Sequence, residues 1–153
     1  MSNTYTQVYI HFVIAVKFRQ ALIDSTWKEE LNKYIAGIIK NKGHKLISVN
    51  NMPDHLHLFC GMHPNQSSSE FMKILKQETS KWINAKGFTN KKFRWQEGFG
   101  AFSYARSQVK TVGDYVDNQE KHHATLPFLS EYKKLLKGFE VEYDGKYIFK
   151  LPL

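Results

Sequence analysis

Polar and apolar positions alternate along residues 55–60, and this alternation is the most informative pattern in the chain. In an extended strand, successive side chains point to opposite faces, so residues two apart point the same way. The run therefore separates into two sets, with His55, His57 and Phe59 on one face and Leu56, Leu58 and Cys60 on the other. The turn residues Pro53 and Asp54 directly precede this run, which predicts that the strand begins at His55.

Two imidazoles that point the same way from a rigid strand can bind one divalent metal ion. The alternative is a pair of structural histidines on a sheet, because a match to His-x-His is short and arises easily by chance. The strand alone leaves both interpretations open.

The spacing of apolar residues elsewhere predicts strands and helices in alternation. Strands are expected over 5–18, 44–52 and 91–105, and helices over 25–42, 70–86, 108–123 and 129–139. With the histidine strand this order predicts an α+β fold: an antiparallel sheet with helices packed on it. The core would be a ferredoxin-like or RRM-like β-α-β-β-α-β unit, followed by a further helix and a C-terminal helical tail.

Local signals refine these boundaries. Thr26 with Glu29, and Ser67 with Glu70, have the spacing of a capping box at a helix start. The stretch 91–105 is basic and aromatic, and its glycines at 98 and 100 predict a kink or bulge. The stretch 5–18 is apolar on both faces, which predicts a central strand, and we interpret His11 on it as structural.

Composition and charge indicate the class of partner. The 153 residues fit one domain, 1–153, with a formal net charge of +8 and a pI near 9.5. Such a charge suits an anionic partner such as nucleic acid, and aromatic residues at 14% could stack on unpaired bases. A single cysteine, Cys60, excludes a disulfide framework and a cysteine-type zinc site.

Targeting signals are not recognisable. The first residues lack the basic-then-apolar layout of a signal peptide, and no apolar stretch approaches the ~20 residues needed to span a bilayer. We therefore expect a soluble, cytoplasmic protein with no membrane association.

Tyr115 and Gln119 lie four residues apart, so a helix over 108–123 would make them neighbours at the edge of its apolar stripe. A core tyrosine at the rim of an amphipathic helix is the ordinary interpretation. The histidine strand favours a second one, in which the Gln119 carbonyl is a third metal ligand and Tyr115 lies beside the metal as a nucleophile. A metal ion can polarise a phosphate for attack by a phenol, and the tyrosine ester keeps the bond energy needed for rejoining.

The chain resembles a known family at these positions. Residues 53–59, Pro-Asp-His-Leu-His-Leu-Phe, resemble the HUH motif, in which U is a bulky apolar residue. Residues 95–103 and 112–123 resemble the second half of the single-tyrosine HUH transposases. These are the TnpA-type enzymes of the smallest bacterial insertion sequences and their REP-associated relatives. The resemblance covers nearly the whole chain, from residue 5 to about residue 139.

The resemblance implies a DNA transposase that cuts and rejoins single-stranded DNA at insertion-sequence ends through a 5′-phosphotyrosine intermediate. Such enzymes recognise subterminal hairpins, use Mg²⁺ or Mn²⁺, and form homodimers that commonly share their active sites. His55 and His57 match the metal histidines, Tyr115 the nucleophile on the catalytic helix and Gln119 the third ligand. The adjacent residues His122 and His123 recur in the family, but we assign them no role.

The ligand set implied by the resemblance has a physical consequence. Two imidazoles and a carboxamide carry no charge, and they suit Mn²⁺, Zn²⁺ or Ni²⁺ better than Mg²⁺. A neutral set predicts weak metal binding, with the scissile phosphate supplying the missing charge. Metal and DNA should then bind together.

Other functions remain as alternatives. They are a domesticated nuclease that processes palindromes, a replication-type nickase, a non-catalytic module that stacks single-stranded nucleic acid on its sheet, and a structural zinc site. The cations that we consider as DNA contacts are Lys17, Arg19, Lys76, Arg94 and Arg106.

Overall fold

A four-stranded antiparallel sheet organises the residues that the computed structural model describes, 3–121 and 127–143. The strand order is β2-β3-β1-β4. The strands are β1 (Tyr9–Ala15), β2 (Lys45–Met52), β3 (His55–Gly61) and β4 (Gly100–Tyr104). Because β3 lies between β1 and β2, the topology is the split β-α-β arrangement of ferredoxin-like folds, and the predicted α+β class is confirmed.

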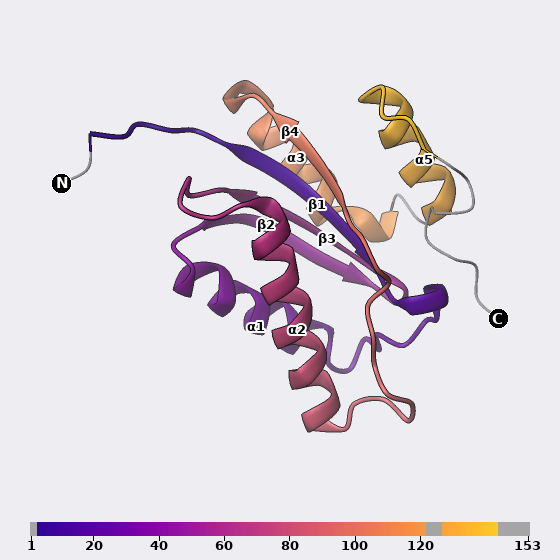
Figure 1. Ribbon diagram of the computed structural model, residues 1–153. Coiled ribbons are helices and arrows are strands. Elements are labelled where there is room, and N and C mark those ends of the chain that lie inside the picture. Colours follow the sequence, from indigo (N-terminus) through magenta and orange to yellow (C-terminus); the bar gives the residue numbers. More distant parts are fainter. Residues whose placement is uncertain (1–2, 122–126, 144–153) are drawn as a thin grey trace.

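Helices cover both faces of this sheet (Figure 1). Helices α1 (Lys28–Asn41) and α2 (Ser68–Lys86) pack on one face, and α3 (Val109–Asp117) and α5 (Phe128–Gly138) on the other. Two short 3-10 helices, η1 (Lys17–Arg19) and η2 (Arg106–Gln108), follow β1 and β4. None of the described helices is long and apolar enough to cross a bilayer.

The larger core lies between the sheet and the pair α1 and α2. Alternate residues of the two central strands enter it, namely Phe12 and Ile14 from β1 and Leu56, Leu58 and Cys60 from β3. Each large apolar side chain buried in this way contributes about 1.5–3 kcal/mol relative to exposure. The other face of β3 carries His55, His57 and Phe59, so the predicted division of this strand is confirmed.

The predicted central position of the first strand is confirmed, because β1 pairs with β3 on one side and with β4 on the other. The strand is shorter than the predicted 5–18. After Ala15 the chain turns into η1, where Phe18 and Arg19 have φ of 58° and 50°. Both edges of Tyr9–Val13 are paired within the sheet, so this part of the strand has no free edge with which to pair with a second subunit.

Helix starts show one predicted cap and one failure. Ser67 accepts a hydrogen bond from the Glu70 amide at the start of α2, as expected. The cap at Thr26 is wrong, because α1 begins later, after Trp27, and the Thr26 amide instead donates to Asp24. An Asx turn therefore leads into α1 in place of a capping box.

The stretch 91–105 forms less strand than expected. Only Gly100–Tyr104 joins the sheet as β4, and Trp95 makes an isolated bridge with Val16. Gly98 has φ of 82°, a conformation that favours glycine, so the predicted kink lies here. The helix predicted over 108–123 is also interrupted: α3 ends at Asp117, a turn follows at 118, and residues 119–121 are helical again.

Gly100 is the residue of β4 against which α5 packs most closely. A Cβ at Gly100 would lie 2.7 Å from Tyr132 Cε1 and Oη, and 3.0 Å from Phe102. Tyr132 belongs to α5 and is buried against the sheet. A side chain at position 100 would therefore push α5 away from the sheet.

We expect Gly100→Ala to destabilise the fold by about 1–3 kcal/mol, because overpacking forces Tyr132 to shift. The free energy of unfolding from urea denaturation measures this loss. Gly37→Ala is the matched control, since a Cβ at that position on α1 meets nothing within 4 Å. It should stabilise the helix by up to about 1 kcal/mol. Equal stability of the two variants would contradict the close packing of α5 on β4.

Candidate metal and tyrosine site

The two histidines of β3 lie side by side beneath α3 and α5. Their ring centroids are 5.1 Å apart, and the side chains are 1% and 0% exposed for His55 and His57. Their backbone neighbours on β1 are Ala15 and Val13. Small and branched residues there leave room for the imidazoles within the layer between sheet and helices.

Each imidazole has a partner on its Nδ1 nitrogen. Asp54, the turn residue before β3, has Oδ1 at 2.7 Å from His55 Nδ1. His11 of β1 has Nε2 at 2.8 Å from His57 Nδ1. Such partners fix ring orientation and tautomer in histidine metal sites, and they direct Nε2 toward the metal. Sequence reasoning treated Asp54 only as a turn residue and His11 only as structural.

Burial keeps His11 neutral. Desolvation lowers its pKa well below the usual value, and the neighbouring His57 lowers it further against an opposing effect of Glu131. For His57 to offer Nε2 to a metal, its Nδ1 must carry the proton and donate it to His11 Nε2. His11 then carries its own proton on Nδ1, an atom without a hydrogen-bond partner among the described residues.

Helix α3, which carries Tyr115, forms hydrogen bonds with the edge strand β2. Asn50 of β2 donates from Nδ2 to the Val116 carbonyl at 3.0 Å, and Ser48 donates to Asp117. Val116 is fully buried, and this fixes the rotation of α3 about its axis. Tyr115 consequently projects toward β3, with its ring centroid 6.0 Å from that of His57.

A buried carboxylate joins the histidine to the tyrosine. Glu131 of α5 is 3% exposed, and its Oε1 lies 3.2 Å from His57 Nε2. The other carboxylate oxygen, Oε2, accepts a hydrogen bond from the Tyr115 hydroxyl. One side chain therefore contacts both His57 and the expected nucleophile.

Sequence reasoning missed Glu131, although the helix that carries it was predicted over 129–139. The buried positions of α5 share helical spacing, and Glu131 is one of them: Phe128, Glu131, Tyr132 and Leu136. A carboxylate in an apolar stripe is unusual because burial of a charge is costly. This buried acid on an apolar face was the signal in the sequence that could have identified Glu131. Phe128 of the same helix stacks on His55, with ring centroids 3.8 Å apart, and covers that imidazole.

The same surroundings hold Tyr115 in its protonated form. Burial raises the pKa of the phenol well above its usual value, and the hydrogen bond and charge of Glu131 raise it further. A hydrogen bond from Gln119 acts in the opposite direction. Gln119 is fully buried and its Nε2 also lies 3.3 Å from the Tyr115 carbonyl. The predicted neighbourhood of Tyr115 and Gln119 is confirmed, whereas the role of Gln119 as a ligand stays a prediction. His122 and His123 lie outside the described residues.

These residues fit a divalent ion. Ligand atoms of His55, His57 and Glu131 all lie within 4.8 Å of one another, and all three residues are buried. Nitrogen from two imidazoles with oxygen from a carboxylate is a common set for catalytic metals, which retain open positions for substrate.

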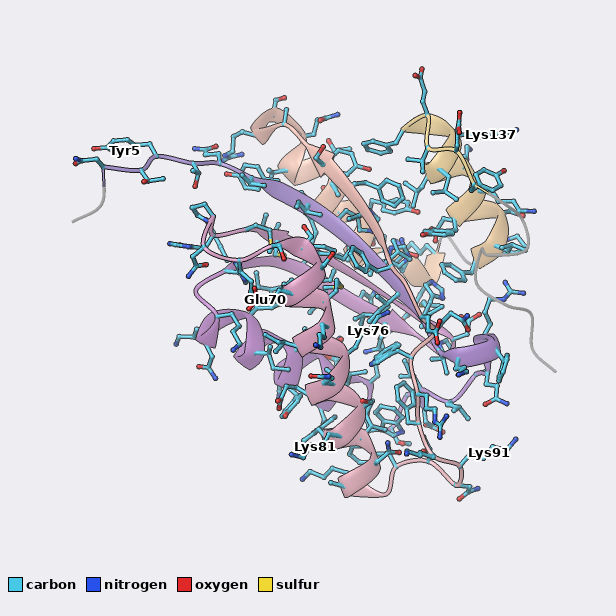
Figure 2. All side chains as sticks on the ribbon, viewed as in Figure 1. Tyr5, Glu70, Lys76, Lys81, Lys91 and Lys137 are labelled. Carbon is cyan, nitrogen blue, oxygen red and sulfur yellow. The ribbon has the colours of Figure 1, made fainter. Side chains whose placement is uncertain are left out.

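The five predicted DNA contacts do not form one cluster. Lys17 and Arg94 line a surface pocket of about 490 Å³ together with Lys91 and Lys92, and Arg94 and Lys76 line another of about 580 Å³ beside α2. Figure 2 labels Lys76 on α2 and Lys91 on the connection that follows it. Arg106 lies beyond Tyr104, which pairs with Tyr9 at the end of β1 remote from His55.

Lys76 has a structural partner that the sequence did not indicate. Its ammonium group donates to the carbonyls of Gln96 and Gly98, and burial lowers its pKa. The side chain therefore holds the glycine turn before β4. Arg19 is half-buried on η1, close enough to Asp54 that its charge contributes to lowering the pKa of that carboxyl.

His11→Phe should weaken the binding of Mn²⁺ to the protein about ten- to a hundredfold, the range seen when a partner of a metal histidine is lost. Phenylalanine keeps the volume but cannot accept the proton of His57 Nδ1. Titration calorimetry with MnCl₂ measures the affinity. His63→Phe is the control, since His63 is exposed beyond the other end of β3. Unchanged affinity in His11→Phe would show that the contact is packing alone.

Solved structures share this fold. The chain resembles a protein of Deinococcus radiodurans described as a candidate transposase, with a TM-score of 0.63 and 19% identity, over 78% of this chain and 95% of that one. It also resembles the REP-associated tyrosine transposase bound to a REP hairpin, with a TM-score of 0.59 and 15% identity, over 95% and 90% of the two chains. At these identities the likeness concerns the fold.

Sequence comparisons identify the family. The chain is 30% identical over 70 residues to the ISDra2 transposase TnpA of Deinococcus radiodurans, and those residues are 46% of this chain. They are 50% of the relative, so the match spans about half the length of that protein. Residues 4–119 match the family described as IS200-like transposases. Because this match includes β3 with its two histidines and α3 with its tyrosine, and extends over most of the chain, the protein belongs to the family of IS200-like transposases.

Proposed function

We propose that this transposase cuts and rejoins single-stranded DNA through a covalent bond between Tyr115 and a 5′ phosphate. The observation that carries the proposal is the shared carboxylate of Glu131, which contacts both His57 and the Tyr115 hydroxyl. These contacts support the assignment of the proposed nucleophile and the proposed metal-binding histidines to one site. We further propose that residues 1–153 act as one HUH domain, in the cytoplasm where the DNA lies.

In the proposed reaction, Tyr115 Oη attacks the phosphorus while the bond to the 3′ oxygen breaks, and the leaving oxygen takes up a proton from solvent to become the 3′-OH. The phenolic proton leaves along the hydrogen bond to Glu131 Oε2. A divalent ion, Mg²⁺ or Mn²⁺, held by His55 and His57 with Gln119 as a third ligand, would polarise the phosphate and neutralise its charge. Rejoining is the reverse attack by a 3′-OH on the phosphotyrosine, which needs no external energy because one phosphodiester-like bond replaces another.

The non-catalytic alternative is less well supported. A sheet that binds bases by stacking leaves one face open for them. Here α1 and α2 cover one face and α3 and α5 the other, over the described residues (Figure 1). A binding module would also have no use for buried imidazoles and a buried carboxylate around a tyrosine hydroxyl.

Recognition of hairpin DNA is also a proposal. It is supported by the likeness to the transposase bound to a REP hairpin, which extends over 95% of this chain. The pocket lined by Lys17, Lys91, Lys92 and Arg94 offers a cationic surface beside η1, at the end of the sheet that carries His55. The REP-associated likeness keeps a domesticated, palindrome-processing role as the second candidate. Cleavage of repeated palindromes in preference to insertion-sequence ends would identify it.

We retain the homodimer with shared sites as a proposal. Within one chain Tyr115 already contacts Glu131 and lies beside His57. A shared site would therefore require α3 of one subunit to take the place of the same helix in the other. The hydrogen bonds of β2 to Val116 and Asp117 would then form between subunits.

Tyr115→Phe should abolish the covalent protein–DNA adduct and leave hairpin binding intact, because only the attacking oxygen is removed. The adduct is measured with labelled single-stranded DNA and Mg²⁺ on a denaturing gel, and binding by a mobility shift. The control is Tyr34→Phe, because Tyr34 is a half-buried residue of α1 that stacks on Trp82. This variant should still form the adduct. An adduct in Tyr115→Phe, or equal cleavage of a fully paired duplex, would contradict the proposal.

Mixing two inactive variants tests the shared site. His55→Ala lacks a metal ligand and Tyr115→Phe lacks the nucleophile, so each should form no adduct alone. If sites are shared between subunits, heterodimers contain one intact site, and adduct should reappear on the chain that carries His55→Ala. If each site lies within one chain, as the Tyr115–Glu131 contact would allow, mixing restores nothing and the shared arrangement must be abandoned.

A further inference from the structure

We propose that Glu131 is a ligand of the divalent ion, so that the metal is held by two imidazoles and a carboxylate before DNA arrives. The inference rests on the proposed metal role of His55 and His57. With Glu131 as a ligand, the proposed set of metal ligands carries a negative charge, whereas two imidazoles and a carboxamide are neutral. Metal binding would then be a property of the free protein.

The positions of the atoms support this ligand set. His57 Nε2, the nitrogen opposite the His11 contact, lies 3.2 Å from Glu131 Oε1. The ligand atoms of both histidines and of Glu131 lie within 4.8 Å of one another. Atoms bound to a common ion at about 2.0–2.2 Å each are separated by roughly 3–4 Å, so small side-chain adjustments suffice.

The energetics of burial favour the same conclusion. A carboxylate taken out of water costs several kcal/mol unless a strong partner compensates. Glu131 is 3% exposed, and the contacts described above are with an imidazole and a phenol. A divalent cation among these groups would offset the cost far more effectively. It would also explain why an otherwise apolar face of α5 carries an acid.

The packing of α5 makes the carboxylate a precise ligand. Phe128 stacks on His55 at 3.8 Å with an interplanar angle of 10°, and Tyr132 fits against Gly100. These contacts on both sides of Glu131 fix the height of the helix above β3. One carboxylate oxygen would bind the ion while the other keeps its hydrogen bond with Tyr115, and the hydroxyl would be held at a set distance from the metal.

A carboxylate also alters the choice of ion. The neutral set of two imidazoles and a carboxamide suits Mn²⁺, Zn²⁺ or Ni²⁺ better than Mg²⁺, whereas a hard anionic oxygen shifts the preference toward Mg²⁺. The two sets therefore differ in what they predict without DNA. The neutral set needs the scissile phosphate for tight binding, and the set with Glu131 does not.

The experiment titrates the DNA-free protein, residues 1–153, with Mn²⁺ alone, and binding is followed by calorimetry and by loss of the electron paramagnetic resonance signal of free Mn²⁺. The wild type should bind one equivalent, and Glu131→Gln should bind at least tenfold more weakly. Gln119→Ala should lose less affinity than Glu131→Gln. Glu30→Gln, the same change on the exposed face of α1, should bind as the wild type does.

Two further measurements separate the loss of a metal ligand from unfolding and from the loss of strand transfer. Circular dichroism and the melting temperature without metal report whether Glu131→Gln is folded. Tyr115→Phe keeps the carboxylate and should still bind Mn²⁺ while forming no adduct, so a failure of the strand-transfer proposal is separate from a failure of this one. Wild-type protein that binds no Mn²⁺ without DNA, or a folded Glu131→Gln with unchanged affinity, would overturn the inference.

Discussion

The buried carboxylate of Glu131 contacts an imidazole of β3 and the hydroxyl of a tyrosine on α3, and the arrangement of the site depends on these two contacts. Elements distant in sequence are brought together there, since His57 and Glu131 are separated by 74 positions. A charged group can remain buried only if each neighbour is oriented to receive it. The orientation of α3 and α5 over the sheet is therefore constrained by polar contacts as well as by apolar packing.

The sheet supplies the rigid part of this arrangement. Strand β3 is held between β1 and β2, so its histidines cannot rotate away from the helices without breaking ladders on both sides. His11 enters from the neighbouring strand and fixes the imidazole of His57. The apolar core on the opposite face depends on the same alternation of side chains. The alternation of side chains along β3 therefore places one set of residues in the core and the other set in the site.

Much of this could be predicted from the sequence where a local period carried the information. The alternation over 55–60 gave the correct faces of β3, and the four-residue spacing gave the contact between Tyr115 and Gln119. Contacts set by tertiary geometry could not be predicted in this way. The His11–His57 pair depends on strand register, and the position of Glu131 depends on how α5 docks.

The boundaries that failed have a common physical cause. An Asx turn at Asp24 forms in place of the cap predicted at Thr26, and the strand predicted to reach Phe18 ends at Ala15, shortly before the positive φ of Phe18 and Arg19. Both are choices between local hydrogen-bonding patterns of similar energy, which neighbouring segments decide. Val16, for example, leaves the β1–β3 ladder but donates its amide to the Asp54 carbonyl and forms a bridge with Trp95.

The position of β3 inside the sheet has a consequence for amide hydrogen exchange. Central strands open only in large unfolding events, whereas helices that pack on one side can detach at lower free energy. The amides of His55 and His57 should therefore exchange among the slowest in the molecule, and those of α5 much faster. His55 and His57 would therefore keep their positions in fluctuations in which α5 detaches from the sheet and returns.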